Sequence, residues 1–287
     1  MSKATFSVAP SNASDASFRV WGKALSDALT AVGCAKTADT GQIDWATVAR
    51  AALSTYAGYE IRTLPASTLQ TACPVYIKIE YGAGSTQTYC AIRVTVGQAT
   101  DGAGNFVGQT TNAFALINSA TSTTASDCYV SCNDDYVAWA MWTGSATGII
   151  QPLYVARPRN SAGVALGTGI NIVGIWSSAG GQQFLPVEGS AFPFATMTSL
   201  CCAAPKVGTG TWGTNLGVFP IFSYQGYAAY PDGVGIGYFV ADIATGGTVV
   251  SLEIFGANHD FVTAGVGNTT AILAGNNNVS SLLIRYE

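Results

Sequence analysis

The sequence has few charged residues. Only 12 Lys and Arg and 16 Asp and Glu occur among 287 residues, so charged residues make up 10% of the chain and the formal net charge is −4. A typical soluble domain has about 25% charged residues. Because the few basic residues are scattered in an acidic chain, no nucleic acid is expected as a partner. So little charge favours a protein whose surface is largely buried against neighbouring subunits.

The chain also lacks long apolar runs. No segment reaches the roughly 18 apolar residues that a membrane-spanning helix needs. Residues 1–17 have no apolar stretch of the kind found in secretory signals, and they predict a loosely bound polar arm at positions 1–13. We therefore expect no membrane span and synthesis in a cytoplasm.

Histidine is nearly absent and the cysteines show no ligand spacing. The chain has one histidine, His259, and seven cysteines without a C-x-x-C pair. A zinc site needs paired ligands, so no metal is expected, and the cysteines are predicted to be buried reduced thiols. The Gly-rich segment 101–105 is predicted to be a hairpin loop, because it lacks calcium ligands and a phosphate-binding Lys.

Motifs for catalysis are missing as well. There is no G-x-S-x-G turn, and any His-dependent nucleophile would have to use His259. We expect no enzyme, no catalytic residue and no cofactor. Glycan hydrolysis by two carboxylates is the one enzyme class still open. Its candidate acids, none in a recognisable motif, are Asp134, Asp135, Asp232, Asp242 and Glu253.

One amphipathic helix is predicted over residues 17–33. Its apolar residues recur every three or four positions and form one stripe: Phe18, Trp21, Leu25, Leu29 and Val32. The opposite face is predicted to carry Arg19, Lys23, Ser26 and Thr30. Ser14, Asp15 or Ser17 can cap the start, and Gly33 can end the helix in a left-handed conformation.

Three sequence blocks surround this helix. The helix block is Phe18, Arg19, Trp21 and Gly22; the connector block is Thr37–Ile43 with Trp45; the strand block is Lys78–Gly82. This succession, FR-x-W-G, TADTGQI-x-W and KIEYG, resembles a group of bacteriophage virion proteins from tail and other structural gene neighbourhoods. The resemblance covers about the first third of the chain. It implies a structural role in a virion and brings no catalytic residues. This chain departs from the pattern at position 34, where it has Cys34 and the resemblance leads us to expect a bulky residue.

The rest of the chain predicts strands. Segments 74–81 and 89–96 alternate apolar and polar residues and form a hairpin with one buried face. On the solvent-exposed face, Lys78 or Glu80 can lie near Arg93 as a cross-strand pair. A second hairpin is predicted from 126–130 and 135–142, with both faces of the latter apolar, as in a strand between layers or at a subunit interface. Short strands separated by Gly-rich turns follow from residue 163.

The predicted fold is mainly β. We expect an antiparallel β-sandwich or barrel-like domain with one N-terminal amphipathic helix packed on a sheet. Residues 1–160 would form the helix and first sheet and 161–287 a Gly-rich β domain, although one continuous β domain is an open alternative. Residues predicted to serve packing or an interface are Phe18, Trp21, Leu25, Leu29, Trp45, Trp139 and Trp142.

The functional expectation follows from the resemblance and the composition. It is a virion structural protein, a tail, collar, baseplate or fibre component that acts in assembly and host attachment and is made in the cytoplasm of the bacterial host. Its partners would be further copies of itself, as a homo-oligomer, and other virion proteins. The alternatives are a capsid-surface or decoration protein, an adsorption module that binds host surface glycan through aromatic residues of 219–230, and a polysaccharide-cleaving enzyme.

Overall fold

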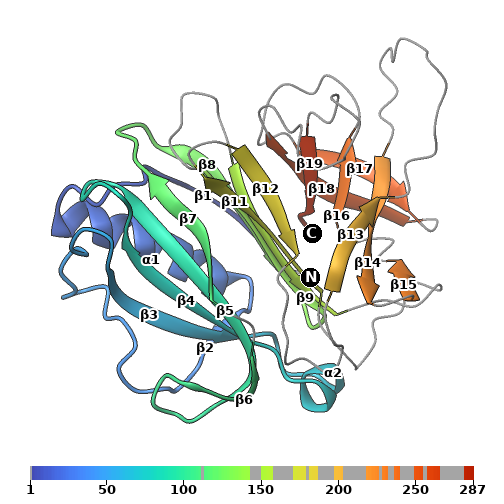
Figure 1. The fold of residues 1–287 in the computed structure, drawn as a ribbon, viewed down its shortest axis with the longest axis horizontal. Coiled ribbons are helices and arrows are strands. Elements are labelled where there is room, and N and C mark those ends of the chain that lie inside the picture. The colour runs from blue at the N-terminus through green and yellow to red at the C-terminus, as the bar shows by residue number, and fades with distance from the viewer. Residues whose placement is uncertain are drawn as a thin grey trace.

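Three antiparallel sheets and one long helix make up the fold (Figure 1). The computed structural model describes residues 2–110, 113–142, 150–157, 171–178, 181–186, 197–202, 218–225, 228–231, 236–239, 249–254, 257–265 and 281–287. The predicted mainly β, antiparallel fold with an N-terminal helix packed on a sheet is confirmed. Among the described strands, none of the three sheet orders closes on itself.

Sheet I follows the helix in the chain. Its strands are β2 (Ala35–Lys36), β3 (Tyr56–Thr63), β4 (Tyr76–Ala83), β5 (Cys90–Thr100), β6 (Phe106–Thr110) and β7 (Phe114–Ala120). They lie in the order β2-β3-β4-β5-β6, and β7 also pairs with β5. The short helix α2 (Thr68–Ala72) connects β3 to β4.

Sheet II is built from two separate parts of the chain. Its strands are β1 (Ser2–Val8), β8 (Ser126–Cys132), β9 (Tyr136–Trp142), β10 (Ile150–Ala156), β11 (Asn171–Ser178) and β12 (Gly181–Pro186), and this is also their spatial order. The pairing of β10 with β11 spans the predicted boundary near residue 160. The division into two domains stays a prediction.

Sheet III contains the remaining strands. These are β13 (Met197–Cys202), β14 (Val218–Gln225), β15 (Ala228–Pro231), β16 (Ile236–Phe239), β17 (Val249–Ile254), β18 (Ala257–Gly265) and β19 (Ser281–Arg285). Their order is β13-β14-β16-β19-β18-β17, with β15 paired to β14.

The predicted amphipathic helix is α1 (Asp15–Ala31). Ser14 is the residue that caps it: its hydroxyl accepts from the Ser17 N–H, and the Ser17 side chain bonds back to Ser14 in a capping box. Gly33 has φ of +87° just after the helix, as predicted. Neither α1 nor α2, the helices of the described residues, is long and apolar enough to cross a membrane.

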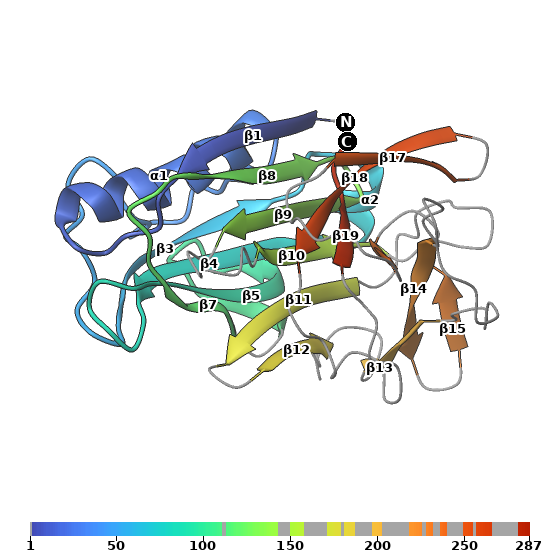
Figure 2. The ribbon, with the colours of Figure 1, turned by 90° about the horizontal axis from the view of Figure 1, so that it is seen from above.

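One buried core joins α1 with sheets I and II. Figure 2 shows α1 beside β1, against which it packs. The core contains six of the seven residues predicted to serve packing or an interface: Phe18, Trp21, Leu25, Leu29, Trp45 and Trp139. The seventh, Trp142, ends β9, and its side chain lies outside the described part. In β4 the residues Ile77, Ile79 and Tyr81 are buried in alternation, as predicted.

Sheet II forms a layer between sheet I and the end of sheet III. From β9, Val137 and Trp139 enter the core shared with sheet I, whereas the ring of Tyr136, on the other face, lies 4.3 Å from the Arg285 guanidinium at the end of β19. The Ser131 hydroxyl of β8 donates to the Arg285 carbonyl at 2.8 Å. Of the two settings predicted for this strand, between layers or at a subunit interface, the structure shows the first.

The predicted loose arm is wrong for Ser2–Val8. This segment is β1 and pairs with β8 along its whole length, from Ser2 opposite Cys132 to Val8 opposite Ser126. A strand ladder uses backbone groups, so small polar side chains do not prevent it. Ala4, Phe6 and Val8 alternate with polar residues and pack against the core. This alternation indicates a strand, although the segment is rich in small polar residues.

The described cysteines agree with the prediction of reduced thiols. Five of them are buried as thiols: Cys34, Cys73, Cys90, Cys128 and Cys132. Cys34, where the resemblance leads one to expect a bulky residue, lies in the core behind the end of α1. The side chains of Cys201 and Cys202 lie outside the described part.

Truncation of Trp21 tests the packing of α1. Trp21 is 1% exposed, so Trp21→Ala should lower the free energy of unfolding by about 3–5 kcal/mol through lost burial and a cavity. Urea denaturation measures this. The matched control is Val20→Ala on the same helix, where the side chain is 63% exposed and little change is expected. Equal effects of the two variants would contradict the packing described here.

Candidate functional site

Two opposite charges of β3 point into the core. Glu60 lies opposite Ile79 of β4 and Arg62 lies opposite Ile77, so both charged side chains share the inner face of sheet I with buried isoleucines. Each side chain is 1% exposed. Burial of an unpaired charge is very costly, so these groups need partners.

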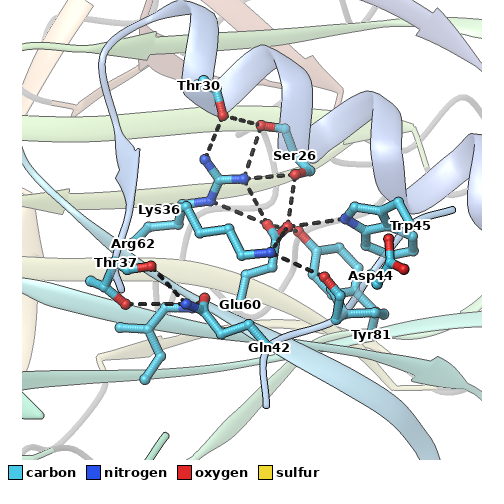
Figure 3. A network of polar contacts seen from close by, with 12 residues as sticks. Ser26, Thr30, Lys36, Thr37, Gln42, Asp44, Trp45, Glu60, Arg62 and Tyr81 are labelled. Atoms are coloured by element: carbon cyan, nitrogen blue, oxygen red, sulfur yellow. Dashed lines mark hydrogen bonds and ion pairs between the residues drawn. The ribbon is translucent and has the colours of Figure 1, made fainter. Parts of the chain in front are cut away.

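The Glu60 carboxylate is saturated with donors (Figure 3). One oxygen, Oε1, accepts from the Ser26 hydroxyl at 2.8 Å and from the Trp45 indole at 3.0 Å. The other, Oε2, accepts from Arg62 Nη2 at 2.8 Å, and Lys36 Nζ lies 3.4 Å from Oε1. Four segments of the chain therefore meet at this carboxylate: α1, β2, the connector and β3.

The Arg62 guanidinium holds the last turns of α1. Its Nη1 donates to the Thr30 hydroxyl at 2.7 Å and to the Cys34 carbonyl at 3.1 Å. Its Nη2 donates to both the carbonyl and the hydroxyl of Ser26, at 3.0 and 2.7 Å. A cation is favourable here, because helix carbonyls carry partial negative charge at the C-terminal end. Ser26, predicted on the polar outer face, is instead buried because it serves this pair.

The network keeps Glu60 ionised. Burial by itself would raise the pKa of Glu60, but the Arg62 charge and the hydrogen bonds from Arg62 and Ser26 outweigh it, so the pKa lies below its ordinary value. Burial and the nearby Glu60 charge raise the pKa of Tyr81 well above its ordinary value. The Tyr81 hydroxyl donates to Glu60 at 3.4 Å. A buried carboxylate whose two oxygens both accept hydrogen bonds fixes the positions of the segments that donate to it.

Trp45 connects the helix block to the connector block. Its ring lies 5.8 Å from Phe18 and 4.8 Å from Tyr81, edge to face with the tyrosine. Trp45 also occupies the space beside Gly22, where a Cβ atom would lie 2.0 Å from the ring. Arg19 donates to the carbonyls of Val48 at 2.6 Å and of Thr47 at 3.0 Å. Only glycine at position 22 lets the connector pack this closely on α1.

Side-chain hydrogen bonds fix the connector block against sheet I. Gln42 donates to the carbonyls of Thr37 and Asp39, and its Oε1 accepts from the Ile61 N–H of β3 at 2.8 Å. Burial would raise the pKa of Asp39, but hydrogen bonds from Thr37 and the Gly104 N–H lower it below its ordinary value. The loop 101–105 is thereby tied to the connector.

The strand block lies on both faces of β4. On the outer face, Lys78 donates to the Gly104 carbonyl at 2.9 Å and lies over the Tyr59 ring. Glu80 accepts two hydrogen bonds from Arg93 of β5, each 2.6 Å long, so Glu80 is the one of the two predicted neighbours that pairs with Arg93. The three blocks therefore contact one another or their immediate neighbours in one structural unit.

Of the five carboxylate candidates, only Asp134 and Asp135 have side chains in the described part of the chain. Asp134 and Asp135 are neighbours in the turn between β8 and β9, the first exposed and the second buried. Glu253 lies in β17 opposite Asn258, but its side chain is outside the described part, and so are Asp232 and Asp242. His259 is in β18, with Nδ1 2.9 Å from Glu287 Oε1. Within the described residues, no group of three or more potential ligands can hold a metal ion.

Sequence reasoning missed Glu60 and Arg62. Strand alternation alone would place Ile61 inward and the charged residues outward. The available signal was their spacing, because opposite charges two residues apart on a strand share one face and can pair.

Compared with known proteins, the chain matches no family model, and no curated protein is significantly similar to it.

Two carboxylates of the same sheet test the buried network. Glu60→Gln leaves the Arg62 charge buried and should cost about 3–5 kcal/mol of unfolding free energy at neutral pH. Glu80→Gln removes the partner of Arg93, whose side chain is 37% exposed, and should cost about 0.2–1 kcal/mol. Denaturant titrations from pH 7 to acid measure both.

The pH dependence has a defined sign. Because the folded pKa of Glu60 is lowered, its contribution is complete above the unfolded value of about 4.3 and is lost as the pH falls through the folded value. The difference between parent and Glu60→Gln should therefore shrink in acid. A difference independent of pH would contradict an ionised Glu60.

A glycine substitution tests the contact of Trp45 with α1. In an open helix, Gly→Ala stabilises by about 1 kcal/mol. Gly22→Ala should instead destabilise by about 1–3 kcal/mol, because the methyl group overlaps the Trp45 ring. In a Trp45→Phe background the same substitution should cost less, since the overlapping ring is smaller. Urea denaturation of the four proteins measures the coupling, and additive effects would contradict the contact.

Proposed function

We propose that the chain is a structural protein of a bacteriophage virion, a tail-associated component that acts in assembly. One observation carries the proposal. The residues that carry the resemblance make contacts within the chain. Trp45 packs on α1, Gln42 accepts a hydrogen bond from β3, and Lys78 donates one to the loop after β5. The resemblance therefore concerns a scaffold, and the virion role follows by analogy with the proteins that the pattern resembles.

Composition supports the same proposal. Charged residues make up 10% of the chain, which suits surfaces that are covered in a permanent assembly. The partners would be other copies of the chain and other virion proteins, and the site of action would be the virion. Tail, collar, baseplate and fibre are all compatible with this composition.

Localisation in the particle tests the proposal. A short epitope inserted at the exposed turn Ser85–Thr86, between β4 and β5, should leave the fold intact. Purified particles carrying the tagged protein should contain it by mass spectrometry, and gold-labelled antibody should mark the tail. Untagged particles are the control.

The other outcomes are equally informative. Label on the capsid would favour a decoration protein over a tail component. A chain that is absent from purified particles would contradict a virion role. Release of reducing sugar from host surface polysaccharide by the purified protein would favour the enzyme alternative, and binding without release would favour an adsorption module.

A further inference from the structure

Strand β1 presents an open edge. Among the described residues it pairs only with β8, and Figure 2 shows it along the margin of sheet II. Backbone N–H and C=O groups of a strand point alternately to its two sides, so about half of those in β1 point away from β8. Such an edge is a template for pairing with another chain.

The usual protective features of edge strands are missing from β1. Its seven residues keep an unbroken register with β8, and the segment contains neither proline nor a bulge. Its only charged residue, Lys3, has Nζ 2.7 Å from Asp260 Oδ2 of β18, so its side chain is held toward β18. Natural proteins generally block open edges with lysines, prolines or bulges.

The edge is also held in place for pairing. Ala4 and Phe6 pack against the core on one face, and Thr5 on the other face hydrogen-bonds the Tyr286 hydroxyl. A strand that is already ordered loses little conformational entropy when a partner adds to it.

The sequence of β1 fits a second copy of itself. In an antiparallel pairing centred on Thr5, Ala4 faces Phe6 of the other copy, Lys3 faces Ser7, and Thr5 faces Thr5. Apolar residues then continue one face and polar residues the other, and no like charges are opposed. The pairing needs no sequence other than the one present.

We propose that β1 is a self-association surface, through which two copies join their sheets II into one continuous antiparallel sheet about a two-fold axis near Thr5. The occupant is a second copy of this chain. The inference goes beyond the virion role, because it names the surface where two copies meet, and its test uses the isolated protein rather than the particle.

A charge placed on the edge tests the proposal. Within its own chain Ser7 lies opposite Asp127 of β8, so Ser7→Lys is tolerated by the fold. In the dimer the new charge would face Lys3 of the other copy, at two symmetric positions. The dissociation constant should rise about tenfold or more. The matched control, Ser85→Lys in the exposed turn after β4, should leave it unchanged.

Two measurements decide the outcome. Sedimentation of the parent from about 1 to about 100 µM should show a concentration-dependent dimer, and amide exchange of residues 2–8 should slow as the dimer forms. The exchange measurement on the parent stands even if Ser7→Lys folds poorly. A monomer throughout this range, or a dimer in which exchange of residues 2–8 is unchanged, would overturn the proposal.

Discussion

The buried Glu60–Arg62 pair determines how the first half of the chain is put together. Both charges lie on the inner face of β3, where water does not reach them, so each must be satisfied by protein groups. Their donors and acceptors come from α1 and from the connector, including Ser26 and Trp45. Any other position of α1 on sheet I would leave a charge without partners. We regard the pair as the element that specifies one arrangement of helix and sheet, the role for which buried polar groups are best known.

The packing around this pair depends on close approach. Trp45 reaches the Glu60 carboxylate only because Gly22 leaves room on α1, and the same ring then contacts Tyr81 of β4. Polar and aromatic contacts therefore reinforce each other, and the core that results extends across to sheet II. This explains why residues far apart in the sequence, from Phe18 to Trp139, belong to one buried cluster.

Sheet II connects this unit to the rest of the molecule. Its inner face belongs to the core with α1, and its outer face meets the end of β19 through Ser131 and Tyr136. Both faces of the sheet are therefore in contact with other layers at β8 and β9, and β1 forms one of its edges. A protein with little surface charge and an open strand edge is suited to association, and this links the fold to the proposed role in assembly.

The local patterns of the sequence determined the secondary structure. The three- and four-residue spacing of apolar residues placed α1, and a serine capped it. Strict alternation identified β4 and β5, and a short run with two apolar faces indicated β9, because these signals depend only on neighbouring residues. Tertiary structure alone decided the inward direction of Glu60 and Arg62, the burial of Ser26 and the pairing of β1 with β8. Each of these depends on partners distant in the chain: a buried charge is stable only where its donors converge, and a polar strand only where another strand offers its backbone.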